Sequence, residues 1–303
     1  GTRSKGVILR AWGCADILSP FVLLTHSKKD PMAKTSSYHR RRHRCLLALS
    51  TACVGMFIGH GALAQDTADS WRFSAGVGLV SQPKYPGSAD TKTTVLPVFS
   101  AHYGRYFIGA VPGAGVPVGV GVYLVQDSHW RVGAALGGNL NQPRKASDSA
   151  RLAGLGDIDG TALGSVFASY SDSWWKLGAN VITDLGGKDH GTRVSMDFEA
   201  RYSPMDRLLL TAGPGFTWAD GKYTQTFFGI NTAQSASSGL PQYSAQSGVN
   251  AVNFNVAANY QLSAQWGLGA RFTTSRLRGD AANSPITEKK AQNTFGVFAS
   301  YRF

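Results

Sequence analysis

The chain ends in the stretch QNTFGVFASYRF, positions 292–303, and this stretch decides the fold. Apolar residues stand at every second position and would share one face of an extended strand. They are Phe295, Val297, Ala299, Tyr301 and Phe303. The positions between them are mostly glycine or polar. The sequence therefore predicts an amphipathic β-strand that ends with an aromatic residue.

The same alternation recurs upstream. Residues 252–262 put valine, phenylalanine and tyrosine on one face and asparagine and glutamine on the other. Residues 193–202 separate apolar from charged side chains in the same way. Because an arginine or lysine that faces lipid at mid-depth costs roughly 2 to 4 kcal/mol, insertion into a bilayer would require this separation. A soluble β-sandwich shows it too, so alternation alone leaves both folds open.

The length and number of the segments favour a membrane barrel. Strands near eleven residues are long for a sandwich but match a tilted bilayer crossing. Twelve strands are predicted, at about 71–81, 94–102, 105–112, 115–126, 129–140, 160–171, 174–185, 192–203, 207–219, 249–262, 265–277 and 292–303. An even number suits a barrel with both termini on one side. Because Gly113 and Ala114 would leave a very short outer loop between the third and fourth strands, ten strands remain an alternative.

The links between these strands alternate in length. Tight turns are predicted at 104, 127–128, 172–173, 203–206 and 263–264, and long links at 82–93, 141–159, 220–248 and 278–291. Short periplasmic turns and long outer loops are typical of outer-membrane barrels. Hydrocarbon offers no partner to a free strand edge, so we expect the sheet to close on itself. The predicted fold class is all-β, a transmembrane antiparallel up-and-down β-barrel of the bacterial outer membrane.

Composition and charge restrict the alternatives. No apolar run reaches the length of about 18 residues that a membrane-spanning helix needs. The net charge of +12 suggests nucleic-acid binding, yet ten of the 30 basic residues and only two of the 18 acidic ones precede position 65. The remainder carries +4, so no nucleic-acid partner is predicted. All three cysteines also precede position 65, which suits export into an oxidising periplasm and excludes cysteine chemistry downstream.

The basic leader has the three regions of a secretory signal. Residues 40–44 read RRRHR, an apolar run of about fifteen residues follows, and HGALAQ comes next. The small residues Ala62 and Ala64 place cleavage before Gln65. A signal anchor is the weaker alternative because the apolar run is shorter than the roughly 20 residues of a membrane-spanning helix.

The leader also fixes the expected domain organisation. Residues 1–31 resemble no part of a signal and are predicted to be a wrongly assigned extension before the true start. Residues 32–64 are the predicted signal peptide, exported through the Sec pathway, and 65–303 the barrel. A lipoprotein with lipidated Cys53 is disfavoured because the residues before it fit a lipobox poorly.

Five segments together carry a family pattern. They are QPKYPGSAD at 82–90, LPVFSAHYGRYF at 96–107, GLGDIDGTALG at 154–164, TQTFFGINTAQSASSGLPQYSAQSG at 224–248 and RLRGDAANSPITEKK at 276–290. Across 71–303 the chain resembles the outer-membrane proteins of the MipA/OmpV family, the MltA-interacting proteins. Two loop motifs stand out, with turn or loop packing as the simpler explanation of their residues. They are Tyr85, Pro86, Gly87, Ser88 and Ser238, Gly239, Leu240, Pro241, Tyr243.

The resemblance implies a role and partners. It implies a scaffold that holds a lytic transglycosylase and a bifunctional penicillin-binding protein in a peptidoglycan-remodelling complex. Outer-membrane lipid and lipopolysaccharide are further expected partners. A last strand that ends in phenylalanine, with aromatic residues at alternate positions, resembles the signal read by the barrel-assembly machinery. We therefore predict that 292–303 serve assembly.

A small-solute channel is the alternative function. The inner face of the predicted barrel would carry charged residues that either line a pore or pair across it and plug it. They are Arg72, Arg193, Asp197, Glu199 and Arg201.

Catalytic and metal sites are not predicted. Asp127, Ser128 and His129 have the residue types of a hydrolase relay, but neighbours on one turn point in different directions. Asp157 and Asp159 supply two ligands, against the six to eight oxygens that Ca²⁺ takes. We therefore expect no enzyme activity and no cofactor.

Overall fold

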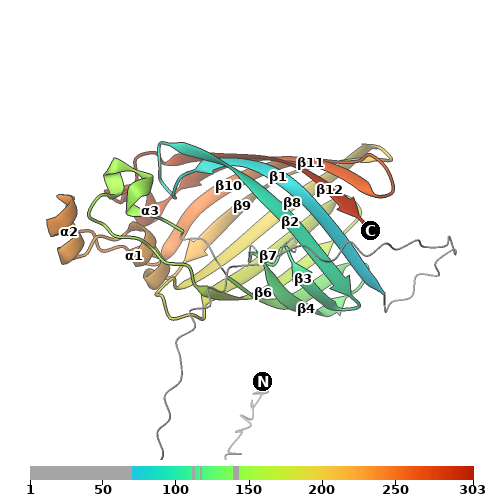
Figure 1. Cartoon of the computed structure of the whole chain (residues 1–303), viewed down its shortest axis with the longest axis horizontal. Coiled ribbons are helices and arrows are strands. Elements are labelled where there is room, and N and C mark those ends of the chain that lie inside the picture. The colour runs from blue at the N-terminus through green and yellow to red at the C-terminus, as the bar shows by residue number, and fades with distance from the viewer. Residues whose placement is uncertain (1–69, 111–112, 117, 139–142) are drawn as a thin grey trace, which may run out of the picture. The chain divides into compact units, whose positions relative to one another are not determined.

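The computed structural model describes residues 70–303 apart from 111–112, 117 and 139–142 (Figure 1). Within this part of the chain, twelve antiparallel strands form one closed barrel, in which each strand pairs with its sequence neighbours and the last pairs with the first. The predicted fold class is confirmed, and the ten-strand alternative is wrong. The predicted extension, signal peptide and cleavage site, including Ala62, Ala64 and Gln65, lie outside the described residues.

The strand boundaries agree with the predicted ones to within a few residues, except around β3 and β4. The strands are β1 Trp71–Pro83, β2 Thr91–Tyr103, β3 Tyr106–Gly109, β4 Gly119–Gln126, β5 Trp130–Gly138, β6 Ala162–Ser171, β7 Trp175–Asp184, β8 Thr192–Met205, β9 Leu208–Ala219, β10 Gly248–Gln261, β11 Trp266–Leu277 and β12 Ala291–Arg302. β3 has only four residues. The predicted end of the third strand at 112 and the predicted start of the fourth strand at 115 are therefore wrong.

The reason is that residues 113–116, the central part of the link between β3 and β4, turn into the barrel. Ala114 and Val116 are buried among the inward-facing side chains of β3 to β7. The hydroxyl of Ser165 donates to the carbonyl of Ala114. Gly115 has a φ of +74°, and a Cβ there would lie 2.5 Å from Cδ1 of Ile182. The predicted short outer loop is therefore replaced by an apolar link packed inside.

Strand register separates an apolar outer face from a polar inner one. Outward side chains such as Val256, Phe272 and Phe295 are exposed. Aromatic pairs lie close to the short turns, with ring centroids 5.3 Å apart for Trp71 and Tyr103, 5.1 Å for Trp130 and Tyr170, and 5.2 Å for Trp266 and Tyr301. Such a belt is typical of a membrane interface.

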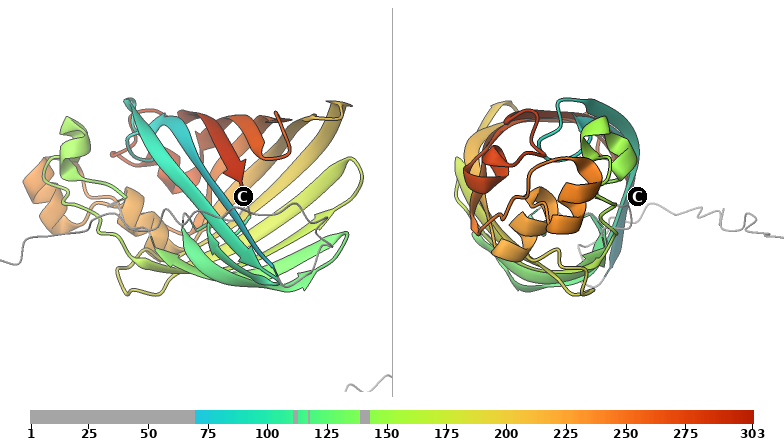
Figure 2. Two further views of the ribbon diagram at one scale, coloured as in Figure 1. Left: turned by 45° about the vertical axis from the view of Figure 1, so that its right-hand side comes forward. Right: turned by 90° about the vertical axis from the view of Figure 1, so that its left-hand side faces the viewer.

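The short turns lie at one end of the barrel and most long links at the other (Figure 1). The long links contain η1 Ala146–Asp148, η2 Ala150–Leu152, α1 Gly221–Phe228, α2 Thr232–Ser238 and α3 Gly279–Asn283. No helix in the described residues is long and apolar enough to span a membrane. Viewed from the long-link end, helices and links lie across the opening (Figure 2, right).

Candidate functional site: a capped barrel and its interior

Five long links form a folded cap over one mouth of the barrel, which we define as residues 84–90, 143–161, 185–191, 220–247 and 278–290. Two clusters of buried apolar residues hold its described part together. One contains Tyr85, Leu152, Leu155, Ile230 and Ile286. The other contains Ile158, Phe227, Phe228, Ala245, Leu277, Ala281 and Ala282. Because each cluster joins links that are far apart in sequence, burial of apolar surface orders the cap as a unit.

The first loop motif docks on the link between β11 and β12. Tyr85 is 2% exposed, and its hydroxyl donates to Oε2 of Glu288 over 2.8 Å. Burial, reinforced by the Glu288 carboxylate, raises the pKa of Tyr85. The carbonyl of Gly87 accepts from the amides of Glu288 and Lys289 over 2.8 and 2.9 Å. Ser88 is buried, and its carbonyl accepts from Gln292 over 3.2 Å, while Pro86 is half-buried beside it.

The second loop motif ends α2 and leads into the same cluster. Gly239 takes a φ of +72° at the end of the helix, a conformation that favours glycine. Ser238 donates its hydroxyl to Gln234 over 2.6 Å, Leu240 packs against the Tyr85 cluster, and Pro241 is exposed. Tyr243 pairs with Ile230 through its backbone and donates its hydroxyl to the carbonyl of Asp280 over 3.1 Å. In this structure, both motifs thus make packing contacts within the cap.

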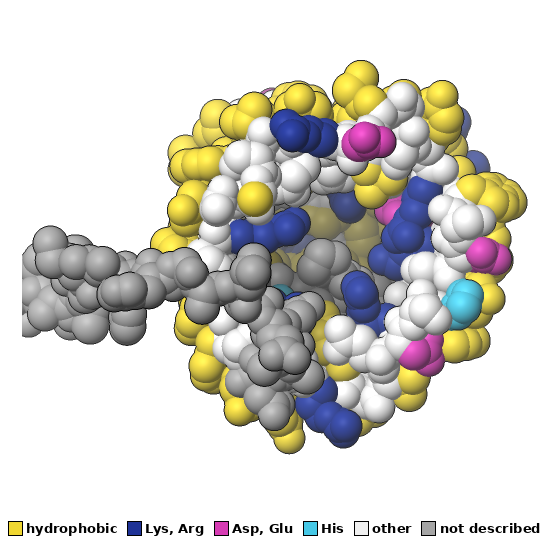
Figure 3. Space-filling view, turned by 90° about the vertical axis from the view of Figure 1, so that its right-hand side faces the viewer, with side chains coloured by type: hydrophobic (Ala, Val, Ile, Leu, Met, Phe, Trp, Pro, Cys, Tyr) yellow, Lys and Arg dark blue, Asp and Glu magenta, His cyan; other side chains and the backbone are white. Residues whose placement is uncertain are grey.

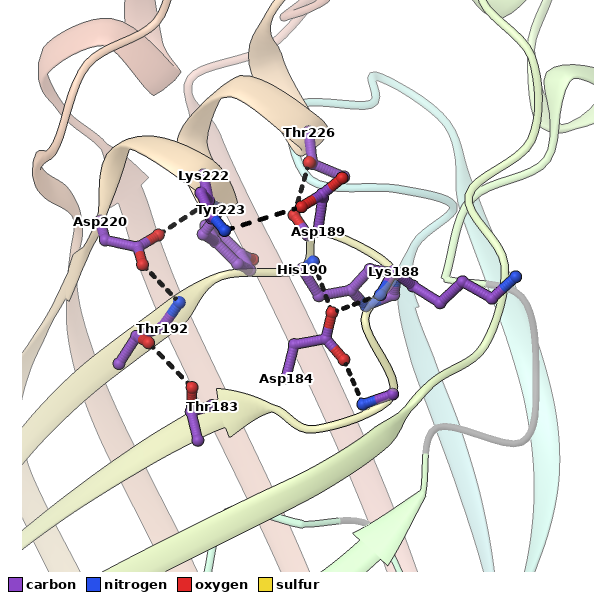
Figure 4. A network of polar contacts seen from close by, with 11 residues as sticks. Thr183, Asp184, Lys188, Asp189, His190, Thr192, Asp220, Lys222, Tyr223 and Thr226 are labelled. Carbon is purple, nitrogen blue, oxygen red and sulfur yellow. Dashed lines mark hydrogen bonds and ion pairs between the residues drawn. The ribbon is translucent and has the colours of Figure 1, made fainter.

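A polar network ties α1 to the link between β7 and β8 (Figure 4). The Asp184 carboxylate accepts from the amides of Gly186, Lys188 and His190 over 2.9, 2.7 and 3.1 Å. Asp220 caps α1 by accepting from the amide of Tyr223 over 2.8 Å, and also accepts from Thr192 over 2.9 Å. Thr226 donates to the carbonyl of Asp189 over 2.7 Å.

His190 contacts α1 and is the residue through which we expect its docking to depend on pH. Its ring lies edge-on to Phe227 at 5.5 Å, and Nε2 has no hydrogen-bond partner among the described residues. Burial lowers the pKa of His190 from its ordinary value of 6.5, while the Asp184 carboxylate and the backbone of Asp159 oppose the shift. The docked cap therefore favours the neutral ring, whereas a detached link would protonate near pH 6.5.

We expect the cap to dock at full strength above about pH 6.5 and to weaken as the pH falls from there to the lowered pKa of docked His190. Below that second value the loss levels off. The measurement is hydrogen exchange at the amides of α1 between pH 7.5 and 5.5. At each pH the exchange rate of the wild type is divided by that of His190→Gln. This ratio cancels the intrinsic pH dependence of exchange. A ratio that stays constant across this range would contradict the expectation.

A polar pocket of about 310 Å³ lies inside the cap. Arg144 is 2% exposed, and its Nη1 donates to the carbonyl of Phe227 over 3.0 Å. Burial lowers the pKa of this guanidinium, while Tyr85 and Asp157 oppose the shift. Besides Arg144, the lining includes Asp157, Asp159 and Lys188, so its formal charges balance. Arg144 could not be found from the sequence because it lies in a long link and follows no strand period.

The five predicted lumen residues lie on the inner face of the barrel. Arg72 is in register with His102 near the short turns, and Arg193 stands 5.1 Å from the ring of Tyr223 near the cap. Asp197 accepts from Asn253 over 3.4 Å. Nε of Arg201 pairs with Oε1 of Glu199 over 2.9 Å, two positions away on β8. Among the described residues no ion pair joins opposite walls, so the predicted plug of paired charges is not found there.

Sequence reasoning missed further inward cations, among them Arg131, Lys176 and Arg271. Their register partners are Ser169, Glu199 and Ala257 on the inner faces of neighbouring strands. The alternation could have found them, since each stands between two outward residues. Arg131, for example, lies between Trp130 and Val132.

The residues weighed for catalysis and metal binding have other contacts. Ser128 Oγ lies 2.9 Å from Nδ1 of His129, but Oδ1 of Asp127 accepts from the backbone amides of His129 and Trp130 over 2.8 and 2.7 Å. Those amides lower the pKa of Asp127. Asp157 accepts from Ala146 over 2.7 Å, and Asp159 pairs with Lys188 at 3.5 Å. In the described residues no three His, Cys, Asp or Glu side chains gather where they could hold a metal ion.

The terminal strand closes the barrel. On the outer face, β12 sets Phe295, Val297, Ala299 and Tyr301 opposite residues of β1. The amide of Phe303 donates to the carbonyl of Phe73 over 3.1 Å, and the Phe303 side chain is 78% exposed. Recognition of this strand by assembly machinery stays a prediction.

Comparison with known proteins identifies the family. The MltA-interacting protein of Escherichia coli K12 is 21% identical over 256 residues, which cover 84% of this chain and 99% of the relative. The putative outer membrane protein YiaT of the same organism is 25% identical over 157 residues, 52% of this chain and 63% of that protein. Among solved structures, the COG4313 outer membrane channel of Pseudomonas putida F1 matches 80% of this chain and 100% of its own, with 13% identity and a TM-score of 0.38. The model of the family described as MltA-interacting protein MipA matches residues 75–303. The chain is therefore an outer-membrane β-barrel protein that belongs to the MipA family.

Proposed function

We propose that this barrel is a non-enzymatic scaffold, which holds a lytic transglycosylase and a bifunctional penicillin-binding protein at its periplasmic end during peptidoglycan remodelling. The observation that carries the proposal is the cap. Four links pack across one mouth around two apolar clusters. The fifth link, 185–191, joins them through the contacts of His190 with Phe227 and of Asp189 with Thr226. A barrel covered in this way serves as a membrane anchor and docking surface better than as an open pore.

The partners of the proposed scaffold are inferred from the family. The relative that matches 84% of this chain is named an MltA-interacting protein, and the name supports contact with a murein transglycosylase. In outer-membrane barrels the short turns face the periplasm. The turns of this chain, for example 172–174 and 262–265, are therefore the surface that we assign to the partners.

A small-solute channel is the second candidate, and one observation favours it. The interior keeps a hollow at the short-turn end with basic side chains on its wall (Figure 3). Movement of the cap would be needed to connect this hollow with the exterior. We infer that the barrel-assembly machinery recognises residues 292–303. Both a scaffold and a channel would need this step, so it does not distinguish the two functions.

Two measurements separate these functions. The tagged barrel is retrieved from solubilised envelopes and its partners are identified by mass spectrometry, and the purified barrel is placed in planar bilayers for conductance. We expect both murein enzymes to be retained and the bilayers to stay silent. Replacing turn residues 263–264 with Asn-Gly should reduce retention, whereas Ser237→Ala in the cap should not. Steady conductance without retention of either enzyme would favour the channel and remove the scaffold.

A further inference from the structure

The half of the interior near the short turns carries an excess of positive charge. Looking into this end, Figure 3 shows Lys and Arg side chains on the wall of the hollow. Register places Arg131 of β5, Lys176 of β7, Arg201 of β8 and Arg271 of β11 on the inner face. These four strands approach the hollow from different sides because the sheet is closed.

Lys176 is close enough to the other three cations to interact with each of them. Lys176 interacts electrostatically with Arg131, Arg201 and Arg271, and with the carboxylate of Glu199. The 2.9 Å contact of Arg201 with Glu199 is the only ion pair that any of the four makes within the described residues. Lys176 thus has three cations and one carboxylate within electrostatic range. We call these five residues the basic vestibule.

Hydrogen-bonded strands fix the backbone positions from which these four cations extend. On a flexible surface, like charges would separate, but here each cation is attached to a strand paired on both sides. Arg131 and Arg271 are exposed to the hollow, so their charges stay open to a ligand. A cleft lined by one sign of charge within low-dielectric walls concentrates counter-ions.

We propose that the basic vestibule binds a small multivalent anion, one that carries several carboxylate or phosphate groups. Arginine forks bind such groups through two parallel hydrogen bonds, and lysine adds a point charge. Because the cations come from separate strands, an anion with one charged group meets only part of the set. Glu199 orients the guanidinium of Arg201 through their 2.9 Å contact. The inference does not depend on the enzymes that the scaffold holds.

The cap determines how the ligand reaches the site. Since the opposite mouth is covered, the anion enters and leaves through the short-turn end. This end is the periplasmic one in the orientation common to outer-membrane barrels. The vestibule would therefore sample periplasmic solutes rather than pass them across the membrane.

Titration calorimetry of the folded full barrel in a nonionic detergent tests the proposal, with sodium citrate, pyrophosphate and acetate at matched ionic strength. We expect saturable binding of citrate and pyrophosphate, and acetate to bind at least about tenfold more weakly. Arg271→Gln and Lys176→Gln should each weaken citrate and pyrophosphate about tenfold, as expected when one charge-assisted contact is lost. Arg271→Lys should keep part of the affinity. The matched control is Lys289→Gln, which removes an exposed cation in the cap and should change nothing.

Circular dichroism and thermal unfolding establish that each variant keeps the barrel fold. The proposal is overturned if citrate and pyrophosphate do not saturate, if acetate binds as tightly, or if Lys289→Gln reduces binding as much as Arg271→Gln. Binding of an acidic peptide with no binding of either small anion would also overturn it, because the ligand would then be a protein segment. If the barrel retains no murein enzyme but still binds the anions, the scaffold function is contradicted and the proposed anion site is not.

Discussion

Tyr85→Ala should release the first link of the cap from the rest. Truncation of a buried aromatic side chain costs about 3 to 5 kcal/mol, and Tyr85 is 2% exposed at the centre of one cap cluster. The lost contacts join links from the beginning and the end of the barrel, so local rearrangement cannot replace them. The free energy that falls is that of docking the cap, since no strand pairing involves Tyr85.

The amides of Glu288 and Lys289 report this change directly, because both donate to the carbonyl of Gly87 when the link is docked. Their hydrogen exchange should accelerate about 100-fold or more in Tyr85→Ala, whereas amides of β10 keep their protection. Tyr85→Phe is the matched control. It keeps the ring and loses the hydroxyl, which donates to Glu288 over 2.8 Å and lies 3.5 Å from the carbonyl of Ile286, so we expect a cost of about 1.5 kcal/mol. Equal exchange in Tyr85→Ala and wild type would show that the cap does not depend on this cluster.

Local pattern was enough to predict the barrel. Alternation along β10 separates Phe254 and Val256 from Asn253 and Asn255, and the structure exposes the first two on the outer face. A strand period is a property of neighbouring residues and can be read without knowing what they touch. The pattern failed only at 110–118, where Gly113 and Gly115 have positive φ and Ala114 turns inward.

The cap could not be predicted, because its contacts are long-range. Arg144 donates to Phe227, 83 positions away, and Tyr85 to Glu288, 203 positions away. Nothing in the local sequence says which loop residue meets which. The interior could be predicted in part. Alternation places a cation on the inner face, but only the register of the closed barrel shows that Arg131 and Arg271 come near Lys176.

Val256→Arg should lower the free energy of unfolding of the barrel by about 2 to 4 kcal/mol, the cost of an arginine that faces lipid near mid-depth. Val256 lies in the middle of β10, 44% exposed on the outer face, opposite Ala212 and Phe272 of the adjacent strands. It also borders an apolar surface hollow of about 480 Å³ that lipid chains would fill. A guanidinium at this place has neither water nor an acidic partner within the described neighbours.

Asn253→Arg is the matched control, three positions away on the same strand but facing the interior, where Asn253 donates to Asp197 over 3.4 Å. An arginine there gains a carboxylate partner and stays in water, so we expect a change within about 0.5 kcal/mol. Urea unfolding of both variants in lipid vesicles, followed by tryptophan fluorescence, gives the two free energies. Equal costs, or a Val256→Arg protein that stays folded in water without detergent, would mean that the outer face is not dissolved in lipid. The difference between the two faces of one strand is therefore the most direct test of the membrane fold.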